Sequence, residues 1–161
     1  GSASAGDVPD IVLNRADPSR SRRWNVERAA GVRVSGYPAL AGGRRPVRGR
    51  VGICAGAGWE CKRWPSASFA ALAELLAARG MEVWWFGSAG ERVGAGEDRT
   101  GTPLAGTIGN LRTVAAYVGN DSGVLHLALA LGVPSVGLFG PTDPAMLFMD
   151  NPLRTPCRRP E

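Results

Sequence analysis

From residue 51 onward, short apolar runs alternate with segments in which apolar residues recur at helical spacing. The apolar runs predict strands at residues 50–54, 82–86, 117–119 and 134–139. A helix is predicted over residues 65–77, because apolar residues recur there at i, i+3, i+4 and i+7 and Gly80 provides a stop. Two more helices are expected, a short one at residues 111–116 and one at 124–131.

The predicted strands are apolar throughout rather than alternately apolar and polar, which is typical of a parallel sheet covered on both sides. The predicted fold class is therefore α/β, a Rossmann-like parallel sheet with helices on both faces. Ligands of such sheets bind at the carboxyl ends of the strands. Three predicted loops lie at that edge, at residues 55–65, 87–92 and 119–126.

The first 49 residues carry weaker signals. Residues 10–13 suggest a strand and residues 25–30 a helical fragment, and Pro, Gly and Arg crowd residues 37–49 as in a linker. We therefore divide the chain into an Arg-rich segment, residues 1–49, and a Rossmann-like domain, residues 50–161.

The helix predicted at residues 111–116 is too short for its place between two parallel strands. It gives under two turns, about 9 Å, whereas a crossover between parallel strands usually needs about a dozen residues or more. Either the crossover begins before Leu104, or residues are absent from this stretch.

Composition fits one globular domain, since the chain has 161 residues, of which 44% are hydrophobic. No apolar run approaches the roughly 18 residues of a membrane span. Three cysteines without a C-x-x-C pair form neither a disulfide framework nor a metal motif. We therefore expect a cytoplasmic protein without a metal site.

The net charge of +5 is unevenly distributed, and 18 of the 19 basic residues are arginines. Residues 1–50 hold ten arginines against four carboxylates, a net charge of +6, and the remaining residues have a net charge of −1. A basic arm of this kind suits a nucleic acid or another polyanion. The alternative, which we favour, is a solvated polar segment that binds no nucleic acid.

Residues 120–123, Asn-Asp-Ser-Gly, follow a predicted strand and precede a predicted helix. Asn120, Asp121 and Ser122 are all good helix N-caps, and Gly123 allows a ligand to approach the backbone closely. The free N–H groups and the positive dipole end of such a helix start suit a phosphate. An ordinary helix cap is the alternative interpretation.

Three other features are candidates for a binding site. Lys62 is the single lysine, and its ammonium suits a phosphate as a compact point charge. The prolines at 141 and 144 make the turn after residue 139 rigid, and that turn carries Thr142 and Asp143. His126 is the single histidine, for which a half-buried structural role is the alternative.

Taken together, three segments resemble glycosyltransferase family 9, the heptosyltransferases of lipopolysaccharide core assembly. They are residues 56–70, which contain Lys62-Arg63-Trp64-Pro65; residues 86–92, Phe-Gly-Ser-Ala-Gly-Glu-Arg; and residues 119–144, which run from Gly-Asn-Asp-Ser-Gly to Phe-Gly-Pro-Thr-Asp-Pro. Their order, spacing and strand–loop–helix context agree across residues 50–145.

The resemblance implies a GT-B fold, in which two Rossmann-like domains face a cleft and the C-terminal one holds a nucleotide-sugar donor. Residues 50–145 look like this donor domain, with Lys62 at the diphosphate and Glu91 at the ribose hydroxyls. Asp121, Ser122 and Gly123 would form the diphosphate turn, with His126 one helical turn further along. Residues that would shape the pocket are Gly56, Gly58, Gly87, Asn120, Pro141, Thr142 and Asp143.

The family's activity is transfer of a sugar, heptose or a related one, from a nucleotide-diphosphate-sugar to a saccharide or glycolipid acceptor. Transfer proceeds with inversion, without a cofactor, and the chain contains no D-x-D pair, which suits a metal-independent enzyme. The resemblance favours an ADP-sugar as donor and suggests peripheral contact with the inner membrane surface.

The chain departs from the family pattern in two respects. Family members are about twice as long and carry an N-terminal acceptor domain with a catalytic carboxylate; no residue here matches that base, so none is assigned. The first-strand motif usually contains His-Pro-Gly, where this chain has Cys54-Ala55-Gly56. Residues 1–49 are then a remnant of the acceptor domain and linker, and the competing hypothesis is a donor-domain fragment that binds nucleotide without transfer.

Overall fold

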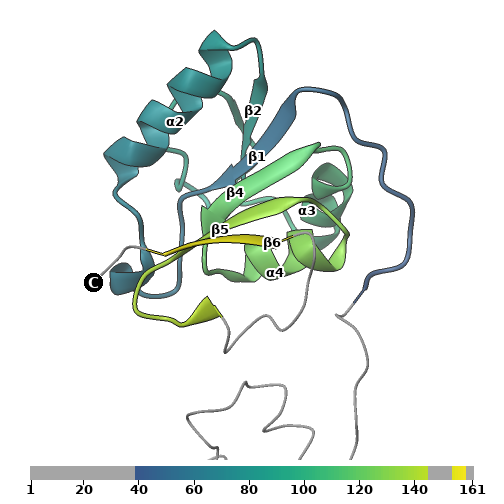
Figure 1. Cartoon of the computed structure of the whole chain (residues 1–161). Helices are drawn as coiled ribbons and strands as arrows, with labels where there is room; N and C mark the ends of the chain where they lie inside the picture. The colour runs from purple at the N-terminus through teal and green to yellow at the C-terminus, as the bar shows by residue number, and fades with distance from the viewer. Residues whose placement is uncertain (1–38, 145–153, 159–161) are drawn as a thin grey trace, which may run out of the picture.

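The computed structural model describes residues 39–144 and 154–158 (Figure 1). These residues form a six-stranded sheet, a short 3-10 helix, η2 (Glu60–Lys62), and three α-helices, α2 (Ser66–Ala78), α3 (Leu104–Leu111) and α4 (Gly123–Ala130). The strands are β1 (Arg50–Cys54), β2 (Glu82–Trp85), β3 (Glu97–Asp98), β4 (Ala116–Asn120), β5 (Ser135–Phe139) and β6 (Arg154–Arg158).

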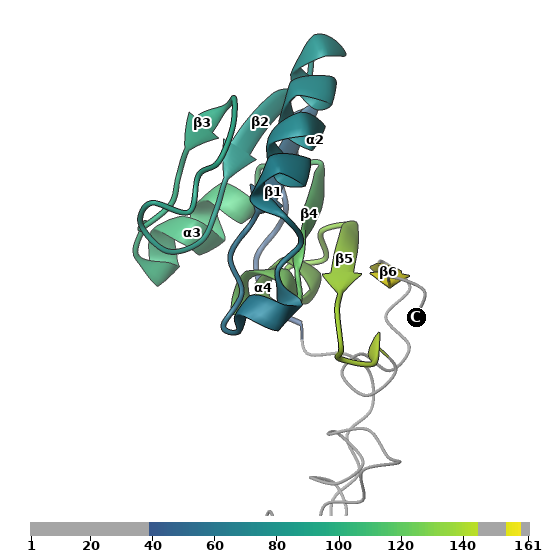
Figure 2. The same cartoon turned by 90° about the vertical axis from the view of Figure 1, so that its left-hand side faces the viewer.

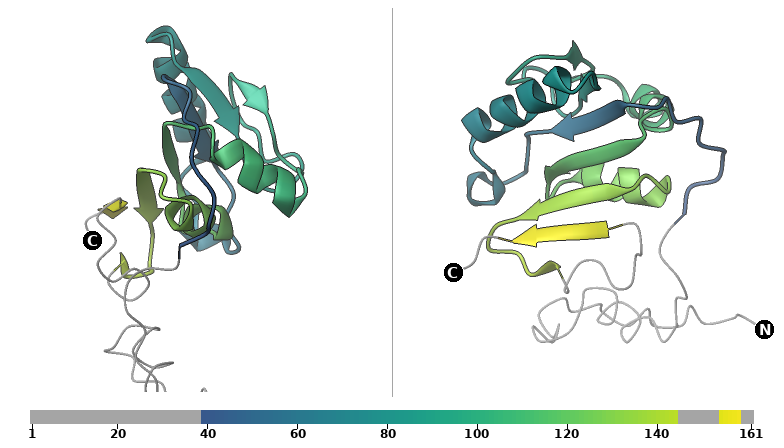
Figure 3. Two further views of the ribbon diagram at one scale, coloured as in Figure 1. Left: turned by 90° about the vertical axis from the view of Figure 1, so that its right-hand side faces the viewer. Right: turned by 45° about the horizontal axis from the view of Figure 1, so that its top comes forward.

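Every neighbouring pair of strands in the sheet is parallel, and the spatial order is β3-β2-β1-β4-β5-β6. Figure 3 shows β1, β4, β5 and β6 side by side with their arrowheads at the same edge. The chain moves outward in one direction from β1 to β3 and then returns to the other side of β1 with β4. The loops after β1 and β4 therefore leave the sheet side by side and diverge, which opens a crevice between them.

Helix α2 lies on one face of the sheet and helices α3 and α4 lie on the other (Figure 2), and an apolar cluster fills the space on each face. On one face, Phe69 and Ala73 of α2 pack against Ile53 and Trp85. On the other face, the residues that pack together come from α3, α4 and the strands, and they include Leu111, Leu125, Leu129, Phe86 and Tyr117. The prediction of a Rossmann-like parallel sheet with helices on both faces is confirmed.

Glycines make room for large aromatic rings on the face covered by α3 and α4. A Cβ atom on Gly119 would lie only 2.5 Å from the Tyr117 hydroxyl oxygen, and one on Gly137 would lie 2.7 Å from the Phe139 ring. Gly119 and Gly137 are opposite each other in β4 and β5. The two paired glycines thus leave space beside each other on neighbouring strands for the aromatic rings. Tyr117 is fully buried there.

The four predicted strands and the helices predicted at 65–77 and 124–131 are confirmed, with ends that differ by one or two residues. The helix predicted at 111–116 is wrong, because Leu111 is the last residue of α3 and Ala116 is already in β4. Gly106 and Gly109 interrupt the apolar pattern of α3, which hid it in the sequence. Strands β3 and β6 were not predicted.

Since α3 begins at Leu104, the connection between β3 and β4 runs over residues 99–115. That length is enough for a parallel crossover, so the shortage inferred from residues 111–116 does not arise. The strand expected at 10–13 and the helical fragment expected at 25–30 lie outside the described residues.

Residues 39–49 run beside the domain before β1 (Figure 1). Backbone N–H groups of this segment donate to carbonyls at the ends of α3 and α4, from Leu40 to Ala130 and from Arg45 to Arg112. The Arg44 guanidinium donates to the Val114 carbonyl at 2.8 Å, and Arg50 pairs with Glu82 at 2.9 Å. Two of the arginines considered for polyanion binding are therefore bound within the domain.

Truncating Phe69 to Ala should destabilise the domain, because its ring is fully buried between α2 and the sheet and contacts Trp64 edge-on. Loss of a buried aromatic side chain costs about 3–5 kcal/mol. Leu75 lies on the same helix and is 55% exposed, so Leu75→Ala should change stability by less than about 0.5 kcal/mol. Urea denaturation followed by circular dichroism measures both, and equal losses would contradict the assigned packing.

Candidate functional site

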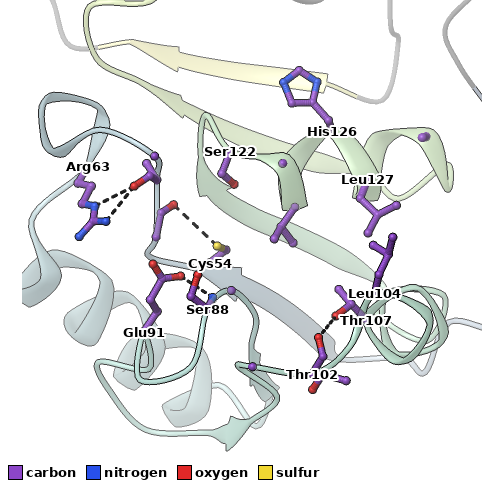
Figure 4. A pocket seen from close by; sticks show the side chains of 18 of the residues that line it. Cys54, Arg63, Ser88, Glu91, Thr102, Leu104, Thr107, Ser122, His126 and Leu127 are labelled. Carbon is purple, nitrogen blue, oxygen red and sulfur yellow. Dashed lines mark hydrogen bonds between the residues drawn. The ribbon is translucent and has the colours of Figure 1, made fainter.

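An open cleft of about 1030 Å³ lies at the carboxyl edge of the sheet and continues between α3 and α4. It is lined by residues 39–40 before β1, the loops after β1, β2 and β3, the start of α3 and helix α4. Figure 4 shows polar side chains at one end of the cleft, around Glu91 and Ser88, and Leu104, Thr107 and Leu127 at the other. We call these the polar end and the apolar end.

Glu91 is held at the polar end by the glycines around it. Its carboxylate accepts a hydrogen bond from the Ser88 backbone N–H at 2.8 Å. It lies so close to the backbone of Gly56 and Gly87 that neither position has room for a Cβ atom. Gly87 also has a φ of 128°, which L side chains rarely adopt. The two glycines therefore allow the carboxylate to lie directly against the loops after β1 and β2.

The start of α4 opens into the cleft with unused hydrogen-bonding capacity. Ser122 is the N-cap, but its side chain makes no capping bond. The Ser122 hydroxyl oxygen is buried and faces the Tyr117 hydroxyl and the Cys54 thiol beneath the cleft. Ser122 and Gly123 both line the cleft. The first N–H groups of a helix have no partner within the helix, so this end presents donors to a ligand.

Beneath the polar end lie a buried thiol and a buried phenol. The Cys54 thiol donates a weak hydrogen bond to the Gly56 carbonyl, with 3.8 Å between sulfur and oxygen. Burial raises the pKa of Cys54, and burial raises the pKa of Tyr117 well above its usual value. Both groups are therefore neutral near pH 7, and the floor of the cleft carries no charge.

Asp121 lies between the two basic side chains predicted for the site. Its Oδ2 is 2.6 Å from Lys62 Nζ, and its Oδ1 is 3.8 Å from His126 Nε2. Burial acts to raise the pKa of Asp121, but the His126 imidazole and the Lys62 ammonium outweigh burial and lower it to about 2. Asp121 is therefore ionised at neutral pH although its side chain is only 4% exposed.

The loop that carries Lys62 is fastened to β4 by a fully buried amide. Asn120 accepts a hydrogen bond from the Trp64 backbone N–H at 3.0 Å and donates to the Ala55 carbonyl at 2.8 Å. Arg63 adds two hydrogen bonds to the Ala57 carbonyl, at 2.9 and 3.1 Å. These bonds fix the path of the chain on both sides of Lys62 and bring its ammonium to Asp121.

A second cavity, of about 510 Å³, lies on the other side of the Lys62 loop. Lys62 lines this second cavity, whereas Glu91, Ser122, Gly123 and His126 line the large cleft. Asp121 lies between the two cavities. One of its carboxylate oxygens faces Lys62 and the other faces His126. The structure thus brings all six predicted donor-site residues to one edge of the sheet, with Lys62 and Asp121 behind the cleft wall.

The predicted pocket-shaping residues separate into three places. Gly56, Gly58 and Gly87 line the large cleft, and Asn120 lines the second cavity. Pro141, Thr142 and Asp143 follow β5 and do not line either of these two cavities. Sequence reasoning missed the apolar end, because Leu104 lies in the unrecognised helix α3. It also gave no role to Arg63, which lines both cavities.

The fold and the site define a Rossmann-like domain. The start of α4 lies at the crevice where the strand order reverses, and its backbone N–H groups suit a phosphate. The family model described as glycosyltransferase family 9 (heptosyltransferase) matches residues 41–152. The chain belongs to this family.

Relatives named as heptosyltransferases are similar to this chain over part of its length. A lipooligosaccharide heptosyltransferase 2 of Haemophilus influenzae is 36% identical over 118 residues, which are 63% of this chain and 33% of the relative. A lipopolysaccharide heptosyltransferase 1 of Pseudomonas aeruginosa is 42% identical over 101 residues, 55% of this chain and 28% of the relative. The chain thus spans about a third of the length of these relatives.

Solved structures agree with the fold. The ADP-heptose lps heptosyltransferase II of Escherichia coli superimposes with a TM-score of 0.58 at 31% identity, covering 74% of this chain and 39% of that one. An E. coli heptosyltransferase with ADP-2-deoxy-2-fluoro heptose gives a TM-score of 0.62 at 21% identity, covering 86% and 48%. The second likeness supports the fold alone. Within the part of the chain that is described, no helix is long and apolar enough to cross a membrane.

Asp121 should make the stability of the domain depend on pH in the acid range. Its folded pKa of about 2 is below the unfolded value, so its contribution is complete above about pH 5 and disappears as pH falls through 2. A shift of this size corresponds to about 2 kcal/mol. Asp121→Asn should reduce the loss of unfolding free energy between pH 5 and 2, measured by urea denaturation.

The exposed carboxylate of Glu74 on α2 provides the control for this measurement. Glu74→Gln should keep the acid dependence of the original chain. An Asp121→Asn variant with an unchanged acid dependence would show that the contacts with Lys62 and His126 do not stabilise the ionised carboxylate.

Proposed function

We propose that this chain is a GT-B glycosyltransferase in which residues 50–145 bind the donor. It binds a nucleotide-diphosphate-sugar, and the sugar, heptose or a related one, is transferred with inversion and without a metal to a saccharide or glycolipid acceptor of lipopolysaccharide. The observation that carries the proposal is the start of α4, where backbone N–H groups at Ser122 and Gly123 open into the cleft, with His126 on the next turn and the Lys62–Asp121 pair behind the cleft wall.

The diphosphate is expected at the start of α4. Backbone N–H groups at Gly123, the Ser122 hydroxyl and the positive end of the helix dipole all stabilise negative charge there. His126 lies on the next turn, with its side chain 42% exposed. The Lys62 ammonium contacts Asp121 at 2.6 Å and has three donors, so a movement toward the phosphates would let it add positive charge there.

Glu91 is suited to the ribose. A carboxylate accepts hydrogen bonds from two neighbouring hydroxyls, and one oxygen of Glu91 is already fixed by the Ser88 N–H. The nucleobase of the donor is then directed to the apolar end. Leu104, which is 68% exposed, faces the cleft there together with Leu127. A flat ring buried between such side chains is stabilised by removal of apolar surface from water.

Catalysis in this proposal depends on stabilising the leaving group. When the bond between the sugar and the diphosphate breaks, negative charge grows on the phosphate oxygen. Donors already present at the start of α4 stabilise the charge without reorganising, and Lys62 adds its positive charge by moving from Asp121 toward the phosphates. The base that activates the acceptor hydroxyl is expected from an acceptor domain, and residues 1–49 are proposed to belong to that domain and its linker.

We place the protein in the cytoplasm, in peripheral contact with the inner membrane surface. Arg45 and Arg48 lie on the segment before β1, at the edge of the sheet opposite the cleft, and Val47 between them is 42% exposed. Basic side chains around an exposed apolar one suit an anionic lipid surface. In this orientation the cleft faces away from the lipid.

Incubation with a panel of ADP-, GDP-, UDP- and dTDP-sugars tests the transferase. We expect isothermal titration to show binding of one nucleotide class, with the ADP-sugars bound most tightly, and mass spectrometry to detect a glycosylated saccharide acceptor. Binding of the nucleotide-sugar without product would favour the competing hypothesis, a donor-binding fragment that does not transfer. Absence of binding to every member of the panel would contradict both.

Lys62→Ala tests the diphosphate site. Loss of the ammonium should weaken binding of a nucleoside diphosphate by about 10-fold to 100-fold, because a hydrogen bond to a charged group contributes about 1.5–3 kcal/mol. Binding of the corresponding nucleoside, measured by titration on the same variant, should change much less. The nucleoside is thus an internal control for folding, and equal losses for both ligands would contradict the role of Lys62.

A further inference from the structure

Two exposed cysteines line the second cavity, on the side of the Lys62 loop away from the large cleft. Cys61 lies in η2, Cys157 lies in β6, and both thiols are free and exposed. They are 96 residues apart in the sequence, so their meeting in one cavity is a product of the fold. The remaining cysteine, Cys54, is buried beneath the large cleft and does not line this cavity.

Both cysteines are positioned by the end of β5. Cys157 is opposite Leu138 in the parallel register of β5 and β6. The Cys61 carbonyl lies against Gly140, two residues after Leu138, so closely that a Cβ atom there would be 2.6 Å from the Cys61 oxygen. Residues 138–140 are therefore in contact with both cysteine-bearing segments, one on each side.

We propose that Cys61 and Cys157 form a redox-active thiol pair whose disulfide joins η2 to β6 next to Lys62. The oxidant is a small disulfide of the glutathione class. The thiolate of one cysteine attacks a sulfur of the small disulfide and forms a mixed disulfide, and one small thiol leaves. The second cysteine then attacks the protein sulfur of the mixed disulfide, and the second small thiol leaves. The two cysteines are oxidised, and the small disulfide is reduced to two thiols.

The placement of the pair favours this chemistry over a passive role. Exposed thiols react with small disulfides, whereas burial raises the pKa of Cys54 and keeps it protonated. Disulfides in reducing compartments are mostly transient and regulatory. A disulfide also requires its two Cα atoms within about 7 Å, so formation of the bond reports directly whether η2 and β6 approach as closely as the proposal needs.

The disulfide should affect the site because Cys61 immediately precedes Lys62. The Lys62 ammonium lines the second cavity, while the proposed diphosphate lies in the large cleft. A bond from Cys61 to β6 would hold η2 on the far side and oppose movement of Lys62 toward the phosphates. This consequence depends on the proposed function; formation of the bond does not.

The test exposes the full chain to oxidised glutathione and maps disulfides by tandem mass spectrometry after proteolysis without reduction. We expect an intramolecular Cys61–Cys157 bond that dithiothreitol reverses. Cys61→Ser and Cys157→Ser should each abolish it, and Cys54→Ala should retain it. Stable glutathione adducts on both cysteines, a bond that includes Cys54, or disulfide-linked dimers in place of the internal bond would each overturn the proposal.

Titration of the oxidised and reduced chain with ADP then tests the consequence. We expect affinity to fall severalfold on oxidation, to recover with dithiothreitol, and to stay constant in Cys157→Ser under the same treatment. If the bond forms and ADP binds equally in both states, the effect on the site is overturned while the thiol pair stands. If ADP does not bind the reduced chain, the proposed function fails independently of the bond.

Discussion

The reversal of strand order between β1 and β4 is the constraint on which the site depends. The chain winds outward from β1 to β3 and then inserts β4 on the opposite side of β1. The loops that follow β1 and β4 consequently leave adjacent strands and turn toward opposite faces, since α2 covers one face and α4 the other. A crevice forms between them, and Lys62 and Asp121, 59 residues apart in the sequence, join the two loops behind its wall.

Burying the Lys62–Asp121 ion pair costs hydration free energy, and neighbouring groups offset part of this cost. A carboxylate with 4% of its side chain exposed loses most of its hydration, and burial alone would favour the protonated acid. Two basic neighbours reverse that preference and lower the pKa of Asp121 to about 2. The Asn120 amide keeps the Lys62 loop in place by bonding to backbone groups on both sides of it. Removing one partner would leave the other charge buried without compensation, so the pair acts as a unit.

The large cleft combines two environments that a nucleotide requires. Its polar end offers a fixed carboxylate and the donors of a helix start, while its apolar end offers Leu104 and Leu127. The floor beneath the polar end is neutral, because burial keeps Cys54 and Tyr117 protonated. The donors at the start of α4 therefore lie above an uncharged floor, and the ionised Asp121 carboxylate next to them is paired with Lys62 and His126.

The sequence by itself determined the parallel sheet, four of its strands and two of its helices, and it pointed to residues at the polar end of the cleft. These features are visible as local patterns of residue types, which a single sequence contains. Examples are the continuous apolar strands, the helix stop at Gly80 and the polar turn at residues 120–123. Helix α3 was not legible, because Gly106 and Gly109 weaken its propensity and its stability comes from burying Leu111 against the sheet. The edge strands β3 and β6 were missed for a related reason, since β3 has two exposed residues and pairing with a neighbour defines both strands.

Only the tertiary structure decided how the predicted site residues are arranged. The sequence places Lys62, Glu91 and Asp121 at the ends of three strands, but it does not say which strands are neighbours. Strand order put Lys62 against Asp121 and on the second cavity, and it put Glu91 between two glycines of different loops. It also brought Cys61 to the same cavity as Cys157. Such contacts depend on packing between segments far apart in the chain, and this information is absent from residue types and spacing alone.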